Sequence, residues 1–257
     1  MKLDDLETKM RRFETAYDHS VLPGIFMVAR IDGRSFTRLT REVHRFEAPY
    51  DVRFRDHMVA TVEHLMVCGF RAVYGYTQSD EISLLFHRDE AAFERKLRKF
   101  DSILAGEASA FFSLRLGAAA VFDCRISQLP TEQLVVDYFR WRQEDATRNA
   151  LNSHCYWLLR KEGMGEREAT GKLLGLSVSA KNELLFGRGI NFAKLPPWQR
   201  RGVGLYWENY EKAGRNPKTG QTSKATRRRI AVDDQLPIRR DYERFVCDRL
   251  IEAGAIK

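Results

Sequence analysis

Short runs of apolar residues predict four strands in the first half of the chain. Residues 25–36, IFMVARIDGRSF, hold large apolar residues that predict a buried strand ending on an Asp-Gly pair. Residues 72–77 and 81–86 are rich in aromatic and branched residues and flank a short polar link, which predicts a β-hairpin. Residues 117–126, GAAAVFDCRI, predict the fourth strand.

Helical spacing of apolar residues separates these strands. The pattern predicts a short helix within residues 3–20, a second over 53–67 and a third over 91–112. From residue 25 onward the order is strand, helix, strand, strand, helix, strand. That order is typical of the ferredoxin-like arrangement, an antiparallel sheet with helices on one face, so we expect an α+β fold.

The second half of the chain is predicted to be mainly helical and then extended. A long helix over residues 131–160 begins with a Thr-Glu capping signal. Asp145 and Arg148 interrupt its apolar stripe, which indicates either a buried ion pair or a ligand-facing turn; the ion pair is the simpler interpretation. Helices over 165–174 and 177–186 follow, then short strands within 190–210 and a mobile basic loop over 214–226.

Two aspartates terminate predicted strands. Arg30 and Asp32 share one face of the first strand, because side chains alternate along a strand. Asp80 lies at the tip of the predicted hairpin, and in a ferredoxin-like sheet the two strands concerned are neighbours. Carboxylates that meet on the open face of the sheet would repel unless a cation lay between them. Their oxygens suit Mg²⁺; the alternative is that each is an ordinary turn aspartate.

The charge distribution indicates a polyanionic partner. The net charge is +8, and residues 197–230 hold nine Lys and Arg against two acidic residues. A localised basic segment of this kind is typical of nucleic-acid binding, although a solvated charged surface would give the same pattern. The four scattered cysteines predict reduced thiols in a cytoplasmic protein. The polar start of the chain has no signal-peptide pattern, and no apolar run is long enough to cross a membrane.

Five motifs occur together and in order: RIDGRSF, GYTQSDEISLLF, FDCR, YFRWRQED and KNELLF. Their combination over residues 20–205 resembles the histidine-tRNA guanylyltransferase family, and most closely its bacterial and archaeal guanylyltransferase-like branch. The resemblance implies a polymerase-like palm that adds nucleotides to the 5′ end of tRNA in the 3′–5′ direction, after ATP or GTP has activated that end. Residues 1–130 would form the palm-like catalytic domain, and residues 131–257 a helical and basic region completing the same globular unit.

The resemblance also implies roles for individual residues. Two Mg²⁺ ions would be held by the side chains of Asp32 and Asp80 and by the carbonyl of Gly33, with Glu81 as a further catalytic residue. The nucleotide substrates, ATP and GTP, would be held by a larger set that includes these metal ligands. That set is Arg30, Asp32, Gly33, Arg34, Ser35, Phe36, Thr37, Ser79, Asp80, Lys96, Lys99, Lys181 and Asn182.

The RNA partner would be tRNA, held by basic and polar residues of the second half, in a protein expected to be a homotetramer. These residues are Arg148, Asn149, Arg200, Arg201, Arg215, Lys218, Lys224, Arg227, Arg228 and Arg229. Two departures from the family pattern favour repair of 5′-truncated tRNAs over strict histidine-tRNA selectivity. Only Asn149 and Leu151 match the eukaryotic signature in residues 147–153, and Ala48 replaces a family lysine. The alternatives are a palm-fold nucleotide cyclase and a non-catalytic RNA-binding protein.

Overall fold

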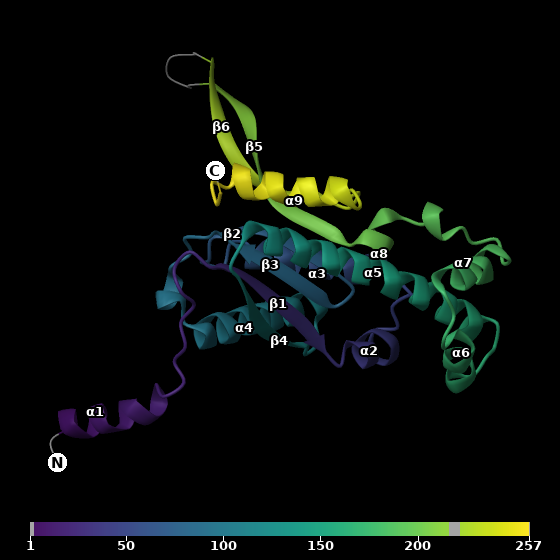
Figure 1. The fold of residues 1–257 in the computed structure, drawn as a ribbon, viewed down its shortest axis with the longest axis horizontal. Coiled ribbons are helices and arrows are strands. Elements are labelled where there is room, and N and C mark those ends of the chain that lie inside the picture. The colour runs from purple at the N-terminus through teal and green to yellow at the C-terminus, as the bar shows by residue number, and fades with distance from the viewer. Residues whose placement is uncertain (1–2, 216–221, 257) are drawn as a thin grey trace.

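A six-stranded antiparallel sheet organises the molecule (Figure 1). The computed structural model describes residues 3–215 and 222–256. The strand order is β4-β1-β3-β2-β5-β6, so the first four strands have the predicted ferredoxin-like order. The strands are β1 (Phe26–Arg34), β2 (Ala72–Gln78), β3 (Glu81–Phe86), β4 (Val121–Leu129), β5 (Val203–Arg215) and β6 (Thr222–Asp233).

Helices α3 (Val52–Leu65) and α4 (Leu97–Leu116) cover one face of the sheet. The alternation along β1 explains the contact, since Met27, Ala29 and Ile31 are fully buried in the core that these helices form. The predicted helices on one face of the first four strands are therefore confirmed, with boundaries shifted by a few residues.

The opposite face is covered as well, which corrects the expectation that the aspartates lie on an open face. Phe26 and Val28 of β1 pack there against helices α5 (Glu132–Lys161) and α9 (Arg240–Glu252). Helix α9 was not predicted from the sequence. Arg30 and Asp32 lie on this face at the end of β1, beside α5. Each of these charged side chains therefore needs either an oppositely charged partner or contact with solvent.

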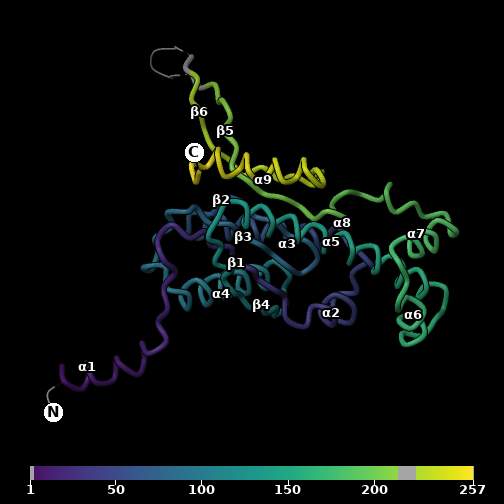
Figure 2. The backbone as a smooth tube through the Cα atoms, viewed as in Figure 1, coloured from purple at the N-terminus to yellow at the C-terminus, as the bar shows by residue number. Residues whose placement is uncertain are grey.

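The far end of α5 carries a small helical subdomain. Helices α6 (Glu166–Leu173) and α7 (Val178–Phe186) pack on the second half of α5, as Figure 2 shows at the right. The chain then returns through a short 3-10 helix (Phe192–Lys194) and α8 (Pro197–Arg201). The prediction of short strands over 190–210 is wrong in its first half, because two helical turns precede a single long strand.

The predicted basic loop over 214–226 is mostly part of a two-stranded ribbon. Strands β5 and β6 pair from Gly204 with Asp233 to Arg215 with Thr222, and their outer half extends past the body (Figure 1). Cross-strand pairing satisfies the backbone of this polar segment, which its composition does not indicate. Lys218 lies outside the described residues, as do the other residues of 216–221.

The remaining helices are short or exposed. Helix α1 (Leu3–Glu14) has no buried residue, and α2 (Phe36–Arg38) runs into a π-helix (Leu39–Val43) after β1. A 3-10 helix (Ala92–Arg95) precedes α4. Among the described residues, no helix has the length and apolar character needed to cross a membrane.

Candidate active site

The end of β1 and the tip of the β2–β3 hairpin form one backbone unit. Asp32 lies opposite Glu81 in the β1–β3 pairing, and the Gly33 N–H donates a hydrogen bond of 3.0 Å to the Asp80 carbonyl. The hairpin closes through the two-residue turn Ser79-Asp80, in which Ser79 has a left-handed φ of 55°. The predicted proximity of the two aspartates is therefore confirmed at the level of the backbone.

The burial of the Asp80 carboxyl group is only partly compensated, because its own backbone N–H, the Ser79 hydroxyl and Arg30 lower its pKa less than burial raises it. The Ser79 hydroxyl donates to its Oδ1 at 3.1 Å. Burial raises the pKa of Asp80, and the neighbouring Asp32 carboxylate raises it further. A carboxyl group in this position gains from a cation, because a positive charge would offset both the burial and the repulsion.

The Asp32 carboxylate lies between two arginines. Arg30 Nε approaches it at 3.1 Å, and the Arg125 guanidinium donates to Asp32 Oδ2. Arg125 comes from β4, where it pairs with Arg30 across the sheet, and its side chain is 61% exposed. Because Arg125 is the more exposed of the two arginines, it is the one that can leave most easily when a cation approaches Asp32.

Glu81 lies between two arginines, Arg30 of β1 and Arg142 of α5. Arg30 Nη2 donates to Glu81 Oε1 at 2.5 Å, and the buried Arg142 donates to Glu81 Oε2. Burial raises the pKa of Glu81, while Arg142 and Arg30 counteract that effect. Both carboxylate oxygens are thus occupied by arginines, so Glu81 acts in this structure as the bridge between β1 and α5.

The ion pair predicted between Asp145 and Arg148 in α5 is present, but its arginine is exposed and the pair is not buried. Arg142 Nη2 lies 3.2 Å from Asp145 Oδ2, and Arg148 donates to Asp145 Oδ1. Asn149 donates to the same carboxylate at 3.2 Å. Arg148 is 71% exposed, so it presents its remaining donors to solvent beside the site. A polyanion on this side of α5 would meet that charge first.

The oxygen atoms at the strand end fit a hard divalent cation. The described residues contain no group of three or more His, Cys, Asp and Glu side chains arranged to hold a metal. A metal ion here would rest on Asp32 and Asp80, with the remaining positions filled by backbone, water or phosphate oxygens. Mg²⁺ is commonly bound through one or two carboxylates together with substrate phosphates, so the donor set suits it.

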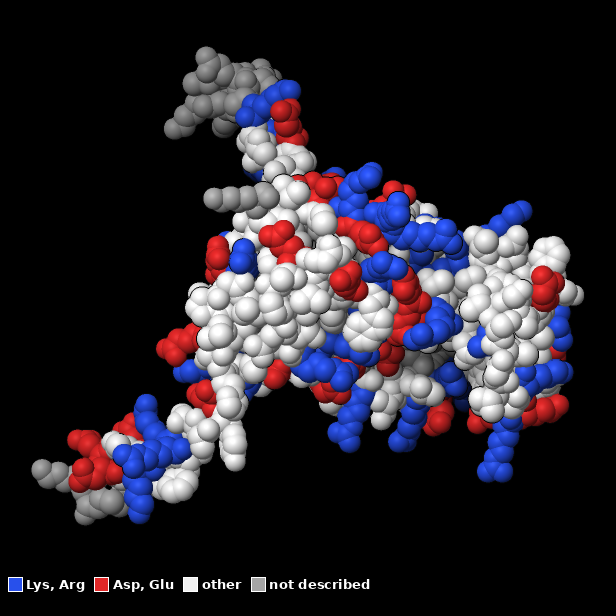
Figure 3. Space-filling view, viewed as in Figure 1, with Lys and Arg blue, Asp and Glu red and all other residues white. Residues whose placement is uncertain are grey.

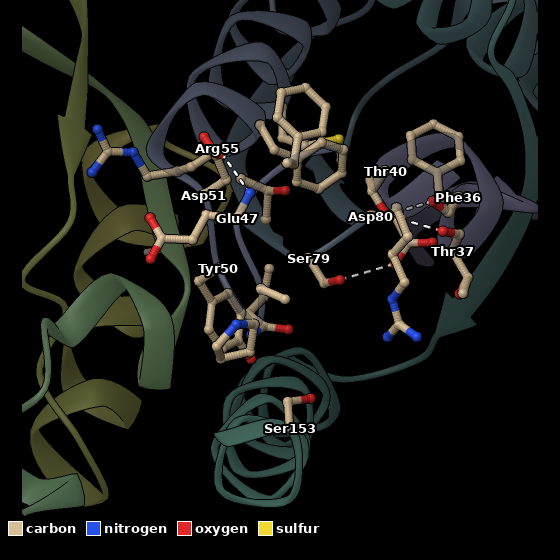
Figure 4. A pocket seen from close by; sticks show the side chains of 18 of the residues that line it. Phe36, Thr37, Thr40, Glu47, Tyr50, Asp51, Arg55, Ser79, Asp80 and Ser153 are labelled. Carbon is tan, nitrogen blue, oxygen red and sulfur yellow. Dashed lines mark hydrogen bonds between the residues drawn. The ribbon is translucent and has the colours of Figure 1, made fainter. Parts of the chain in front are cut away.

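A pocket opens directly beside Asp80 (Figure 4). Its space is about 950 Å³, including the part open to solvent. In Figure 4, Asp80, Thr37 and Thr40 lie on one side, with Glu47, Asp51 and Arg55 on the other. The further lining residues are Phe36, Arg41, Phe46, Ala48, Pro49, Tyr50, Phe54, Met58, Thr77, Gln78, Ser79, Ser153, Trp157, Trp198 and Val203.

The polar groups of the pocket are fixed by their own contacts. Asp51 caps α3 by accepting from the Arg53 N–H, and its hydrogen bond with the Arg53 side chain lowers its pKa to about 2. Burial raises the pKa of Tyr50 to about 12, so its hydroxyl stays protonated while it accepts from Gln78 Nε2 at 3.0 Å. The pocket thus combines aromatic walls with polar groups that are held in place by the protein, which suits a planar heterocycle.

The stretch after Asp32 shapes the mouth of this pocket. A Cβ added at Gly33 would lie 2.5 Å from the Phe36 ring, so the residue has no space for a side chain. Ser35 adopts a left-handed φ of 61° as the strand turns into α2. Phe36 and Thr37 line the pocket as predicted for nucleotide-binding residues, whereas Arg34 and Ser35 are exposed at its edge.

Four predicted nucleotide-binding residues lie elsewhere. Lys96 caps the start of α4, where Arg95 donates to the Ile25 carbonyl just before β1 begins. The seven residues from there to Asp32 span about 20 Å. Lys96 instead lies 3.0 Å from Glu94 and 3.9 Å from Asp18. The family resemblance assigned Lys96 to the nucleotide site, but it did not show at which end of the sheet α4 begins.

Lys99 belongs to the same distant turn of α4, close to the Phe93 ring. Lys181 and Asn182 lie on α7, which packs against the second half of α5, and neither lines the pocket. The Lys181 carbonyl accepts from Cys155 Sγ, and Asn182 Nδ2 donates to the Val178 carbonyl. The structure therefore does not bring these residues to Asp32 and Asp80.

Apart from Arg148 and Asn149 on α5, the predicted RNA-binding residues that the structure describes lie before β5 or on the β5–β6 ribbon, where Arg215 ends β5. Arg200 and Arg201 donate to the carbonyls of Leu195 and Leu236, so they help to hold the return of the chain into β5. Those of β6 are exposed on the ribbon, whose basic and acidic side chains intermingle near its tip in Figure 3.

Several ribbon charges are already partnered. Lys224 pairs with Glu211 at 2.9 Å and Arg229 with Glu208 at 2.5 Å. Arg228 stacks over the Trp207 ring at 4.9 Å. Arginine over an aromatic ring is a surface that also stacks nucleic-acid bases.

Comparison with known proteins decides the family. The family model described as tRNAHis guanylyltransferase matches residues 7–130, and the Thg1 C terminal domain model matches residues 133–242. The chain belongs to the tRNA(His) guanylyltransferase family. Members of this family are nucleotidyltransferases that extend the 5′ end of tRNA in the 3′–5′ direction, so the resemblance noted in the sequence is confirmed.

Individual proteins that are similar to this chain belong to the same family. A probable tRNA(His) guanylyltransferase of Drosophila melanogaster is 36% identical over 198 residues, covering 73% of this chain and 69% of the relative. The tRNA(His) guanylyltransferase of Debaryomyces hansenii is 32% identical, covering 86% and 87%. The solved structure of a bacterial guanylyltransferase-like protein in complex with GTP is 27% identical, with a TM-score of 0.69 and 98% coverage of both chains.

Proposed function

We propose that this protein adds nucleotides to the 5′ end of a tRNA by Mg²⁺-dependent nucleotidyl transfer, with the reaction centred on Asp32 and Asp80. The observation that carries the proposal is that the backbone brings the end of the strand at Asp32 and the hairpin tip at Asp80 together, with Asp80 lining a pocket with aromatic walls. Phosphoryl transfer demands little covalent chemistry from a protein and depends on positioned charges around the phosphates.

Asp32 and Asp80 would hold the metal, and Mg²⁺ when bound would neutralise charge on the phosphate oxygens. The carbonyl of Gly33 is the further ligand that the family resemblance implies. Asp32 must then exchange at least one arginine contact, and Arg125 is the exposed one. Glu81 would act through Arg30 and Arg142, which it holds in place, rather than by touching the substrate.

The pocket would take the nucleoside part of ATP or GTP. Crystals of a bacterial relative contain GTP in one structure and ATP in another. In this chain Tyr50 and Trp198 offer aromatic side chains to a base, while Asp51 is held by the backbone N–H of Glu47 and by Arg53 and fixes the wall of the pocket. Thr37, Ser79 and Asp80 all line the pocket, so a triphosphate bound there would lie beside the Asp80 carboxyl group.

The tRNA would lie along α5 and the ribbon. Arg148 and Asn149 flank the strand-end cluster, and the β6 arginines continue the basic surface. Ion pairs to phosphates are sensitive to salt, so binding should weaken steeply as ionic strength rises. A homotetramer and a cytoplasmic location remain predictions that accompany this substrate assignment.

We further propose that repair of 5′-truncated tRNA is the main reaction. The experiment is a 5′-extension assay on two substrates, a full-length histidine tRNA and another tRNA that lacks its first nucleotide. Preferential, template-directed extension of the truncated tRNA supports repair. Preference for untemplated guanylate addition to the histidine tRNA would contradict it, and formation of a cyclic nucleotide without RNA would replace the whole proposal.

A further inference from the structure

Trp141 is a large apolar side chain that stands half exposed beside the charged residues at the end of β1. Its exposed fraction is 51%. The Arg142 guanidinium lies 4.6 Å from the centre of its ring, and Arg142 in turn donates to Glu81 of β3. Because Arg142 covers one face of the indole, the exposed area belongs to the rest of the ring. The indole is therefore anchored next to the charged residues while part of it faces solvent.

Trp141 lies on the side of α5 that faces away from α9. Arg140 pairs with Glu243 of α9 at 2.9 Å, and Trp141 is one residue further, about 100° around the helix. Asp145 is four residues beyond Trp141, so the two share one side of α5. On that side the Asp145 carboxylate contacts Arg142, the same arginine that lies over the indole.

The part of the sheet on this side is exposed. Strand β4 is the outer neighbour of β1, whereas α9 packs over β2 on the other side of the sheet. Asp123 of β4 lies opposite Asp32, and Arg125 of β4 contacts Asp32 directly. Both β4 side chains are exposed. An RNA end that approaches Asp32 over β4 would therefore pass the exposed part of Trp141.

The surroundings of Trp141 favour a nucleic-acid base as its partner. Arg125 and Arg148 are 61% and 71% exposed, and each keeps N–H donors beyond those it uses to pair with an aspartate. These donors can meet phosphates on either side of a base. Proteins that hold unpaired nucleotides combine such cations with aromatic side chains on which bases stack. Stacking accepts all four bases, because each has a π face.

Template-directed extension of a truncated tRNA, the reaction proposed above, needs this tolerance. The base opposite the missing 5′ nucleotide is unpaired before each addition, and any of the four bases can occupy that position. A side chain that recognised one base by hydrogen bonds would restrict the reaction, whereas a stacking side chain does not.

We propose that Trp141 stacks on this template base and holds it for the incoming nucleotide. The inference rests on the proposed repair reaction, and it makes Trp141 a positioning residue for the template strand.

The first test measures the stacking itself. A truncated tRNA carries 2-aminopurine, whose fluorescence falls when it stacks, as the template base. No nucleoside triphosphate is added, so no reaction occurs. At saturation the wild type and Trp141→Phe should quench the probe, and Trp141→Ala should lose most of the quenching. Leu134→Ala is the matched control and should quench as the wild type does, because Leu134 is an exposed apolar residue two turns earlier on the same side of α5. Equal quenching by the wild type and Trp141→Ala would overturn the proposal.

The second test separates stacking from a purely structural role. The activation step needs no template base and is measured with 5′-monophosphorylated RNA and ATP. The addition step is measured with 5′-triphosphorylated RNA and the complementary nucleotide. Trp141→Ala should lower addition by roughly tenfold or more, as expected for one lost stack, and should lower activation much less. Trp141→Phe should restore addition.

Equal losses in both steps would show that Trp141 supports the fold and would overturn the proposal. If the wild type itself extends no truncated tRNA, the proposed repair reaction is wrong. Normal addition by Trp141→Ala, beside an active wild type, would contradict the stacking alone.

Discussion

The two ends of β1 hold charged clusters that use the same residue types in opposite ways. Before the strand, Arg95 is 7% exposed and donates to the carbonyls of Val21, Ile25, Arg88 and Glu90. After the strand, the buried Asp80 carboxyl has a second carboxylate nearby, and the Ser79 hydroxyl, its own backbone N–H and Arg30 offset its burial only in part. A buried charge with a complete set of backbone partners stabilises the fold, whereas crowded carboxylates leave a site for a cation.

The largest effect expected from this comparison is on catalysis. Asp32→Asn and Asp80→Asn should each lower the rate of 5′ nucleotide addition by roughly a thousandfold or more, because each removes a charge that the metal and phosphates need. Asp18→Asn, at the other end of the strand, is the control and should keep its activity. Single-turnover assays at saturating Mg²⁺ measure both; a loss below tenfold at Asp32 or Asp80 contradicts the metal assignment.

The next effect is on stability. Arg95→Met should lower the free energy of unfolding by about 3 kcal/mol, since the carbonyls it serves lose their donors inside the protein. Arg98→Met, on the adjoining helix α4, is the matched control. Arg98 pairs with Asp18 at the surface, so its loss should lower the free energy of unfolding much less. Urea unfolding measures the difference, and equal losses would remove the distinction between the two clusters.

The free energy of unfolding should depend on pH through Asp80, at the end of β1 that holds the crowded carboxylates. The raised pKa of Asp80 means that the folded protein binds this proton more tightly than the unfolded chain does. The free energy of unfolding therefore falls as the pH rises from about 4 through the folded pKa. Asp80→Asn removes that loss, so in metal-free buffer its stability relative to the wild type should increase with pH. A difference that stays constant with pH would show that Asp80 is not strained.

The smallest effect lies on the ribbon, outside both clusters. Arg227→Gln should weaken tRNA binding a few-fold and reduce the slope of log affinity against log salt by about one. Arg140→Gln is the control, because Arg140 is exposed on α5 but pairs with Glu144 and Glu243. Filter-binding titrations at several salt concentrations measure the slopes; identical slopes for both variants would exclude the ribbon from the RNA interface.

The sheet order and the two aspartates could be predicted because their signals are local. The apolar runs and the short polar link defined β1, β2 and β3, and the alternation along β1 placed Arg30 and Asp32 on one face. The ion pair of Asp145 with Arg148 could also be predicted, because the two residues are three positions apart in one helix. In each case the residues concerned lie within one strand or helix, or in strands that the topology makes neighbours.

Features that depend on distant segments could not be predicted. Tyr50, Trp157 and Trp198 meet in the pocket from three separate parts of the chain, and no spacing connects them. The polar residues of the ribbon resemble a loop until their pairing partners are known. Lys96 was assigned by the family resemblance, but the direction in which α4 crosses the sheet puts it at the end of β1 away from Asp32.

Direct binding of Mn²⁺, a spectroscopic substitute for Mg²⁺, tests the central claim about the Asp32 and Asp80 end of β1. The measurement is electron paramagnetic resonance of free Mn²⁺ titrated with the protein in the presence of GTP. The wild type and Asp18→Asn should remove Mn²⁺ from solution equally, and Asp80→Asn should bind it at least tenfold more weakly. Equal binding by the wild type and Asp80→Asn would contradict the account.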